Sequence, residues 1–330
     1  MASTRISVIG AGAWGTALAH IIAKAGNNVT LWGRNKKIIE ELRTSKTNSV
    51  YLNQLKLSNR IYPTENIDYA CIADVILLAV PAQSVRRVAT QMMEFTQPNS
   101  KIICCAKGFE THTGNLMSEV LSDIFHADQL AFLSGPTFAA EIVQGFPSAA
   151  TLATSDIQVG QQLAMELSSE NFRLYFNTDI IGVQVGGAAK NIIAIASGIA
   201  RGQGFGENTR AALVTRGLAE TTRLAVKLGG VAQTLAGLAG LGDLLLSCST
   251  TQSRNFLYGN LLGTGEKNDA ILKKIGGVVE GVYSTAAIEK KAKLLEIELP
   301  ICSAVNSILY READIASMIE ELLQRPIRLE

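Results

Sequence analysis

The sequence predicts an α/β fold with a mostly parallel sheet in its first part and an all-α fold in the rest. Up to about residue 180, short apolar runs alternate with amphipathic helical patterns, which is typical of parallel strands joined by crossover helices. Beyond that point the strand-like runs stop and long helical patterns follow. We therefore expect two domains, residues 1–182 and residues 183–330.

The individual elements follow from the spacing of apolar residues. Strands are predicted at Ile6–Ile9, Val29–Trp32, Val75–Ala79, Ile102–Ala106, Ala131–Ser134, Ala149–Thr154 and Arg173–Phe176. Between them, helices are predicted at Ala13–Ala25, with Gly26 as a C-cap, at Lys36–Ser45 and at Gln83–Phe95. The second part is predicted to contain helices at Val183–Arg201, Thr209–Leu228, Ser284–Leu295 and Ser303–Leu309.

Charge and hydropathy exclude several classes of protein. The 30 Lys and Arg residues nearly balance the 29 Asp and Glu residues, so no global field attracts this chain to nucleic acid or to an anionic membrane. The apolar stretch near the N-terminus resembles a secretion signal, but Gly10, Gly12 and Gly15 interrupt it. Residues 183–200 come closest to a membrane span, and Lys190 lies in their middle. We expect no membrane span.

Cysteine and histidine usage points to a reduced compartment without a metal site. The five cysteines are odd in number and irregularly spaced, which does not fit a disulfide framework. This usage indicates a cytoplasmic protein. The only histidines are His20, His112 and His126, and none lies at metal-ligand spacing from a cysteine or a carboxylate. We therefore expect no metal.

A dinucleotide-binding motif follows the first predicted strand. Gly10, Gly12 and Gly15 form a GxGxxG pattern between that strand and a helix, within one βαβ unit. In such a Rossmann-type unit the first glycine permits the tight turn, the second lets the backbone approach a pyrophosphate, and the third allows close helix–strand packing. The helix N-terminus adds oriented N–H groups and a positive dipole. The alternative is a turn without a ligand.

The end of the second predicted strand bears on the choice of cofactor. An acidic residue there would accept a hydrogen bond from the adenosine ribose, but the chain reads Gly33-Arg34-Asn35. Arg34 offers a planar guanidinium to a 2′-phosphate. We therefore expect NADPH to bind, with NADH as a possible second cofactor; a solvent-exposed helix start is the alternative role for Arg34.

Two further strand ends carry polar groups at the edge where open α/β sheets bind ligands. Lys107 follows one strand and is placed to meet a substrate, although a lysine that reaches back to water would fit the same position. Gly135 and Thr137 follow another strand and offer a backbone N–H and a hydroxyl to an anion. Thr137 as a helix cap is the alternative.

The second part holds polar residues in apolar surroundings. Lys190 lies in a nearly all-apolar helix, where an ammonium is costly unless it pairs, faces a cleft or loses its proton. Asp243 is placed to orient it. Ser253, Arg254 and Asn255 together suggest a phosphate cradle, with a polar loop and helix cap as the alternative. We expect the four cations Arg34, Lys107, Lys190 and Arg254 to converge on one cleft.

The order of these motifs is specific. They are GAGAWGTALA from Gly10, CAKG from Cys105, SGPTFAAE from Ser134, GGAAKNIIAIASG from Gly186, GLGDL from Gly240, SRN from Ser253 and VVEG from Val278. Together they resemble the bacterial NAD(P)-dependent sn-glycerol-3-phosphate dehydrogenase family. The resemblance implies reversible reduction of dihydroxyacetone phosphate to sn-glycerol 3-phosphate with NADPH or NADH, feeding glycerophospholipid biosynthesis, in a cytoplasmic homodimer.

The resemblance also implies roles for single residues. Lys190 falls on the family's proton-transferring lysine, and Lys107 would stabilise the developing alkoxide. Substrate contacts fall on Lys107, Gly135, Thr137, Lys190, Asp243, Ser253, Arg254 and Asn255. Cofactor contacts fall on Gly10, Gly12, Ala13, Trp14, Gly15, Arg34, Lys107, Ala139, Arg254, Val278 and Glu280. Ala13 replaces a common serine, so only its backbone N–H is left for a pyrophosphate. Residues 47–59 match poorly, and no role is assigned to Tyr51.

Two other functions fit parts of the sequence. A related two-domain dehydrogenase for a β-hydroxyacid or for phosphogluconate would also place a Lys-Asn pair on the first helix of its second domain. A dinucleotide-sensing module without turnover would explain the glycine motif but would leave Lys190 and Asp243 without a role.

Overall fold

The computed structural model describes residues 4–324 and residue 326. The described chain forms two compact units. The first comprises the residues up to Lys107 together with Leu116–Gln184, and the second comprises Gly108–Asn115 together with the residues from Val185 onward. No pattern in the sequence indicated that Gly108–Asn115, from the first half of the chain, belongs to the second unit.

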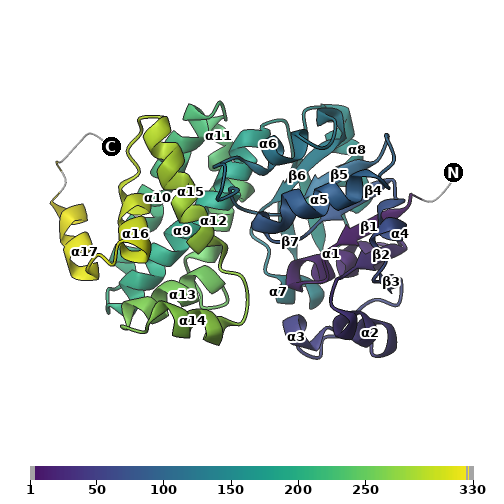
Figure 1. The fold of residues 1–330 in the computed structure, drawn as a ribbon, viewed down its shortest axis with the longest axis horizontal. Helices are drawn as coiled ribbons and strands as arrows, with labels where there is room; N and C mark the ends of the chain where they lie inside the picture. The colour runs from purple at the N-terminus through teal and green to yellow at the C-terminus, as the bar shows by residue number, and fades with distance from the viewer. Residues whose placement is uncertain (1–3, 325, 327–330) are drawn as a thin grey trace. The chain divides into compact units, whose positions relative to one another are not determined.

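The first unit contains an eight-stranded sheet in the order β3-β2-β1-β4-β5-β6-β7-β8 (Figure 1). Neighbouring strands are parallel except β6 and β7, which are antiparallel. The strands are β1 (Ile6–Ile9), β2 (Val29–Trp32), β3 (Ile61–Thr64), β4 (Val75–Leu78), β5 (Lys101–Cys104), β6 (Leu130–Ser134), β7 (Ser148–Ala153) and β8 (Phe172–Asn177). The predicted mostly parallel α/β fold is therefore confirmed, and each of the predicted strands is present.

One strand was missed in the sequence. β3 lies at the edge of the sheet and pairs only with β2. It contains Pro63, and its Tyr62 is exposed. Proline cannot donate to a strand ladder and is tolerated at a sheet edge, so an apolar run with internal proline does not look like a strand in the sequence.

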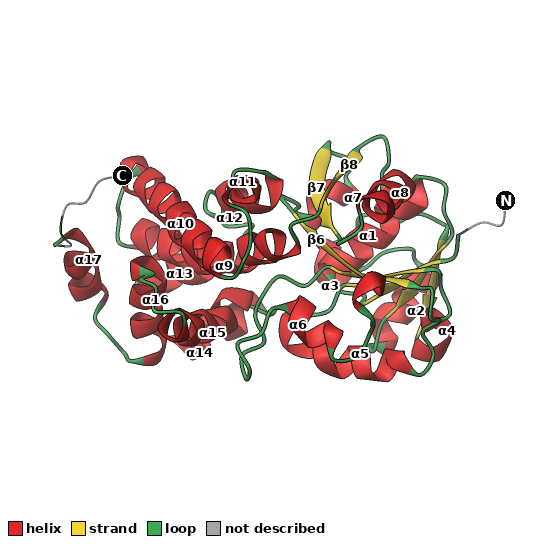
Figure 2. Ribbon diagram, turned by 90° about the horizontal axis from the view of Figure 1, so that it is seen from above, coloured by secondary structure: helices red, strands yellow, loops and turns green. Residues whose placement is uncertain are grey.

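Helices cover both faces of the sheet (Figure 2). α1 (Ala13–Lys24), α7 (Ala139–Val143) and α8 (Ile157–Leu167) lie on one face, and α4 (Ile67–Cys71), α5 (Val85–Met93) and α6 (Met117–Ser122) on the other. The remaining helices of this unit are α2 (Lys36–Thr44), α3 (Ser49–Leu52), η1 (Ala82–Ser84) and η2 (Ala127–Gln129). Because both faces are covered, the strands read as continuous apolar runs rather than as alternating ones.

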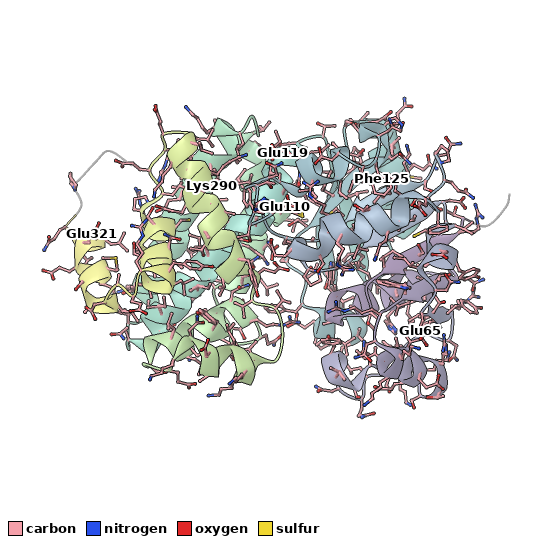
Figure 3. All side chains as sticks on the ribbon, in the orientation of Figure 1. Glu65, Glu110, Glu119, Phe125, Lys290 and Glu321 are labelled. Carbon is pink, nitrogen blue, oxygen red and sulfur yellow. The ribbon has the colours of Figure 1, made fainter. Side chains whose placement is uncertain are left out.

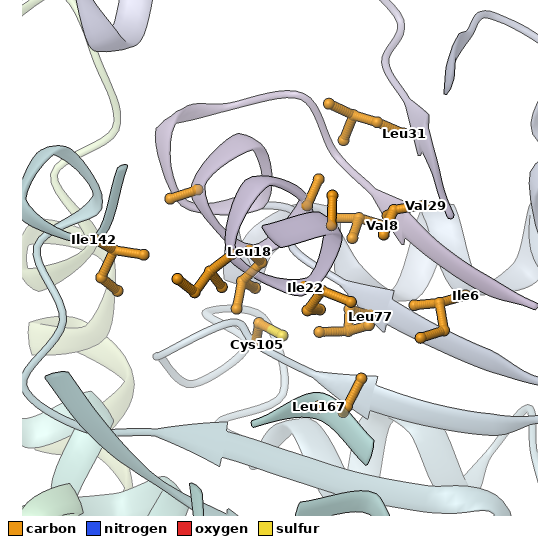
Figure 4. Packing of buried hydrophobic residues seen from close by; sticks show 14 of the residues in the cluster. Ile6, Val8, Leu18, Ile22, Val29, Leu31, Leu77, Cys105, Ile142 and Leu167 are labelled. Carbon is orange, nitrogen blue, oxygen red and sulfur yellow. The ribbon is translucent and has the colours of Figure 1, made fainter. Parts of the chain in front are cut away.

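Successive strand residues point to opposite cores. Val75 and Leu77 of β4 pack in the cluster beneath α1, whereas Ile76 and Leu78 pack in the cluster beneath α5. Figure 4 shows the first cluster, where Leu18 and Ile22 of α1 lie over strand residues. Charged side chains such as Glu65 lie at the surface (Figure 3). This division of the side chains fixes the register of the sheet.

The second unit is helical. It is built from α9 (Ile180–Gly202, from Val185 onward), α10 (Glu207–Lys227), α11 (Ala232–Leu235), the π-turn η3 (Leu238–Gly242), α12 (Asp243–Ser247), α13 (Arg254–Gly263), α14 (Asn268–Ile275), α15 (Glu280–Leu294), α16 (Pro300–Tyr310) and α17 (Ile315–Leu323). α9 is long and apolar enough to cross a membrane, but its most apolar window is 89% buried within the protein. It is a core helix.

Glycines allow α9 and α13 to touch along their backbones. A Cβ atom at Gly198 would lie 2.1 Å from the Phe256 carbonyl oxygen, and one at Gly259 would lie 2.1 Å from the Ile195 carbonyl oxygen. Neither position can carry a side chain without separating the helices. Part of the glycine content of the second unit is thus required by helix packing.

Candidate active site

The glycine motif forms the turn between β1 and α1. Gly10 has φ +122°, and its N–H donates to the Trp32 carbonyl oxygen at 2.9 Å. A Cβ atom at Gly15 would lie 1.8 Å from the Gly10 carbonyl oxygen, so the helix can approach the turn only with glycine there. A Cβ atom at Gly12 would meet no described atom within 4 Å. The turn is therefore closed at its first and third glycines and open at the second, as a backbone-bound pyrophosphate requires.

The start of α1 can receive an anion. Gly12 is its N-cap residue, no side chain caps it, and its first turn contains no acidic residue. The first N–H groups of a helix have no partner within the helix. The indole Nε1 of Trp14 is buried and has no hydrogen-bond partner among the described residues. The backbone donors at this helix start thus fit the phosphate groups of a dinucleotide.

Arg34 lies after β2, next to the glycine turn. Its side chain is exposed, and α2 begins two residues later with Asn35 as its N-cap, whose Oδ1 accepts from the Lys37 N–H at 3.0 Å. Neighbouring Lys36 approaches Glu65 at 3.9 Å, with the lysine side chain 87% exposed. The role of Arg34 toward a 2′-phosphate stays a prediction.

We expect Arg34→Ala to change cofactor preference. Loss of a guanidinium–phosphate contact should raise KM for NADPH by about tenfold, because such charge-assisted bonds contribute about 1.5–3 kcal/mol. KM for NADH should change little. Both constants are measured by steady-state kinetics, with Lys36→Ala as the control for loss of a nearby positive charge. An unchanged ratio of the two constants in Arg34→Ala would exclude the 2′-phosphate role.

Lys107 and Thr137 meet at the end of the sheet. The Lys107 ammonium Nζ donates to the Gly135 carbonyl oxygen at 2.9 Å, and the Thr137 hydroxyl donates to the same oxygen at 3.2 Å. Gly135 has φ +154°, and a Cβ atom there would lie 2.8 Å from Ala150 Cα. The structure brings these three predicted residues together. Thr137 does not cap the next helix, because Phe138 is the N-cap residue of α7 and Ala139 is its first residue.

Lys190 forms a buried ion pair. Its ammonium Nζ donates to Asp243 Oδ1 and, at 2.8 Å, to Ser247 Oγ. Lys190 is 9% exposed and Asp243 is 1% exposed. The carboxylate offsets part of the cost of removing the ammonium from water. The expected pairing of Lys190 with Asp243 is thus present.

The π-turn η3 and a glycine of α9 make this pair possible. Asp243 follows η3 directly, and a Cβ atom at Gly186, one helical turn before Lys190, would lie 2.4 Å from the Ala239 carbonyl oxygen. The backbone of η3 therefore rests on α9 where there is no side chain. Such π-turns occur often at functional sites. Ser247 was missed in the sequence, although its spacing of four residues from Asp243 places both on one face of α12.

The Ser253-Arg254-Asn255 segment starts α13. The Ser253 hydroxyl caps the helix by accepting from the Phe256 N–H at 3.4 Å, as the alternative reading of this segment predicted. Arg254 Nη1 donates to the Val278 carbonyl oxygen at 3.3 Å. A Cβ atom at Gly277 would lie 2.9 Å from that nitrogen. The guanidinium thus lies across the backbone of the VVEG segment, and glycine leaves room for it.

Asn255 links three helices. Its Oδ1 accepts from the Gly281 N–H at 2.9 Å, and its Nδ2 donates to Asn191 Oδ1 at 2.8 Å. Gly281 lies beside Glu280, the first residue of α15. The amide therefore ties the helix of Arg254 to the helix of Lys190. Arg34 and Lys107 belong to the first unit, and Lys190 and Arg254 to the second, so their convergence on one cleft stays a prediction.

A Rossmann-type unit with an open glycine turn and a helical unit with a buried lysine–carboxylate pair, in one chain, define a dinucleotide-dependent dehydrogenase. Residues 5–160 match the NAD-dependent glycerol-3-phosphate dehydrogenase N-terminus, and residues 179–320 match the C-terminus of the same family. The chain belongs to the NAD-dependent glycerol-3-phosphate dehydrogenase family.

The similarity to relatives and to a solved structure extends over 98% of this chain. The chain is 46% identical to a glycerol-3-phosphate dehydrogenase [NAD(P)+] of Maricaulis maris, over 98% of each chain. It is 43% identical to the enzyme of the same name from Rhodospirillum rubrum, over 98% of this chain and 93% of that one. The crystal structure of glycerol-3-phosphate dehydrogenase from Coxiella burnetii has a TM-score of 0.93 at 35% identity, covering 98% of this chain and 99% of that one.

Proposed function

We propose that this chain reduces dihydroxyacetone phosphate to sn-glycerol 3-phosphate and that Lys190 transfers the proton. The observation that carries the role of Lys190 is its burial beside Asp243 in a chain of this family. When bound, NADPH or NADH supplies the hydride that adds to carbon 2 of the ketone. The Lys190 ammonium gives its proton to the carbonyl oxygen, which becomes the hydroxyl of the product. In the reverse direction the neutral amine accepts that proton.

The other residues bind and orient. We assign the glycine turn, with Ala13 and Trp14, to the pyrophosphate, and Arg34 to the adenosine end of the cofactor. The further cofactor contacts are Lys107, Ala139, Arg254, Val278 and Glu280. The substrate contacts are Lys107, Gly135, Thr137, Lys190, Asp243, Ser253, Arg254 and Asn255. Arg254 suits a phosphate because its guanidinium can donate two hydrogen bonds in one plane. Binding energy at the phosphate then orients the carbonyl.

The assembly and the compartment are also part of the proposal. The five cysteines are free and buried, and burial raises the pKa of Cys104 and of Cys248 to about 12. Unreactive thiols of this kind suit a reducing, cytoplasmic environment. We propose a homodimer that supplies glycerophospholipid biosynthesis; light scattering of the purified protein measures the number of chains.

One assay tests the proposed activity. Oxidation of NADPH is followed with dihydroxyacetone phosphate, with dihydroxyacetone and with a β-keto acid. We expect kcat/KM for dihydroxyacetone to be about 10²-fold or more below that for the phosphorylated ketone, because binding of the remote phosphate contributes to the transition state.

Other results of the same assay would overturn the proposal. Equal turnover of dihydroxyacetone would contradict a phosphate site. Preference for the keto acid would favour the β-hydroxyacid dehydrogenase alternative. Binding of NADPH without consumption of any ketone would favour a sensing module.

A further inference from the structure

A buried asparagine joins the glycine turn to the helix that follows it. Asn48 lies just before α3, and its side chain is fully buried. Its amide Nδ2 donates to the Ala11 carbonyl oxygen at 3.1 Å and to Thr16 Oγ1 at 2.8 Å. Ala11 is the residue between Gly10 and Gly12, and Thr16 belongs to α1. One amide group therefore holds the turn against α1.

The segment that carries Asn48 is fastened on both sides. The Glu41 carboxylate of α2 accepts from the Thr47 hydroxyl at 2.7 Å, and from the N–H and the hydroxyl of Ser49 at 2.8 and 2.9 Å. Burial alone would raise the pKa of Glu41, but these hydrogen bonds outweigh it and lower the pKa below its ordinary value. The carboxylate therefore stays ionised at neutral pH and keeps Asn48 in place.

The arrangement carries an energetic cost. Asn48 Oδ1 is buried and has no hydrogen-bond partner in the part of the chain that the structure describes. A buried acceptor without a partner costs about 1–3 kcal/mol in general. An apolar residue of similar size would avoid this cost but would leave the Ala11 carbonyl oxygen without this donor. An apolar residue at position 48 could not make the two hydrogen bonds that Asn48 Nδ2 donates to Ala11 and Thr16.

The Ala11 carbonyl also sets the direction of the next N–H group. The C=O and N–H of a trans peptide point in opposite directions, and no described peptide bond is cis. With the Ala11 oxygen held on the side of Asn48, the Gly12 N–H faces away from Asn48. A Cβ atom placed on Gly12 would meet only open space, unlike one on Gly10 or Gly15. An anion can therefore approach the backbone at this point.

We propose that Asn48 is a positioning residue for the cofactor: by holding the Ala11 carbonyl, it presents the Gly12 N–H to the pyrophosphate. The proposal rests on the assignment of the glycine turn to the pyrophosphate. Asn48 acts through the backbone and touches no reacting atom. It gives a role to the segment after α2, to which the sequence patterns assigned none.

Binding measured without turnover tests this role. The dissociation constant for NADPH is determined by fluorescence for the wild type, Asn48→Ala and Asn48→Asp. We expect about a tenfold rise for Asn48→Ala, corresponding to loss of the bond that orients the peptide. Asn48→Asp should weaken binding further, because a carboxylate cannot donate to Ala11 and adds negative charge near the phosphates. The kcat value at saturating NADPH should stay within about threefold of wild type, because the lost interaction stabilises bound NADPH equally in the ground state and in the transition state.

Two controls separate positioning from general damage. Asn66→Ala removes the Oδ1 that caps α4 by accepting from the Tyr69 N–H at 3.1 Å, in the same unit. It should lower Tm without changing the dissociation constant. Adenosine 2′-phosphate, which has no pyrophosphate, should compete equally well for the wild type and for Asn48→Ala.

The outcomes distinguish this proposal from the assignment on which it rests. If the wild type does not bind NADPH, the proposed function itself is wrong. If it binds and Asn48→Ala binds equally tightly, or if adenosine 2′-phosphate weakens as much as NADPH, Asn48 has only a structural role and the inference is overturned.

Discussion

Replacing Lys190 with arginine should abolish most turnover while leaving the fold intact. Arginine keeps the positive charge that faces Asp243, but a guanidinium stays protonated in proteins and cannot supply the proton for ketone reduction. A positioned general acid contributes about 10²- to 10⁴-fold to a rate. We therefore expect kcat to fall by about that factor, with a much smaller change in the dissociation constant for NADPH.

The comparison with Lys190→Met gives the control. Methionine also lacks a transferable proton, so its kcat should fall equally. It removes the Lys190 ammonium from the Asp243 carboxylate, which is 1% exposed, so Lys190→Met should unfold at a lower temperature than Lys190→Arg. Steady-state kinetics and thermal unfolding of both variants provide the test. If Lys190→Arg retained activity within a few-fold of wild type, another group would have to transfer the proton.

The sequence predicts the fold well because the strongest patterns are local. The runs that form β1 and β2 are short, apolar and bounded by glycine or by polar residues, and the glycine turn between strand and helix fixes how the first βαβ unit is connected. β3 is not recognisable in the sequence, because Pro63 and its exposed neighbour Tyr62 interrupt the short apolar run that is typical of a buried strand. Its place in the sheet depends on pairing with β2, which periodicity does not reveal.

The sequence predicts which residues form the candidate site, but not the backbone contacts that place them. A lysine in an apolar helix must be compensated, and Asp243 is the partner that the sequence analysis proposed. The pair also depends on the π-turn η3, whose Ala239 packs against Gly186 of α9. This contact could not be predicted, because the two residues are 53 positions apart in the sequence. The role of Asn48 could not be predicted for the same reason. Its partners Ala11 and Thr16 are distant in the sequence, and its own segment contains no motif.

Buried carboxylates can also have a purely structural role. Glu220 of α10 is 3% exposed, and its oxygens accept from the Ile301 and Cys302 N–H groups, at 2.7 and 3.2 Å, at the start of α16. Burial raises the pKa of this carboxyl despite those bonds. Burial alone does not distinguish Glu220 from Asp243. The difference lies in the partner, because Glu220 binds helix N–H groups whereas Asp243 binds a side chain that can transfer a proton.

Removing Asp243 should destabilise the protein more than removing both members of the pair. Asp243→Ala removes the carboxylate that pairs with the Lys190 ammonium, which is 9% exposed. Loss of one member of a buried ion pair costs about 3–5 kcal/mol in general. We expect a decrease of that size in the free energy of unfolding, measured with urea, together with a large loss of kcat.

The double variant Lys190→Met/Asp243→Ala gives the sign of the interaction. It contains no buried charge at this position, and apolar replacement of a whole buried pair is often neutral or stabilising. We therefore expect the double variant to be more stable than Asp243→Ala, although it is equally inactive. Purely additive losses of stability would mean that the two side chains do not depend on each other for burial, which would contradict the pairing that places the ammonium for catalysis.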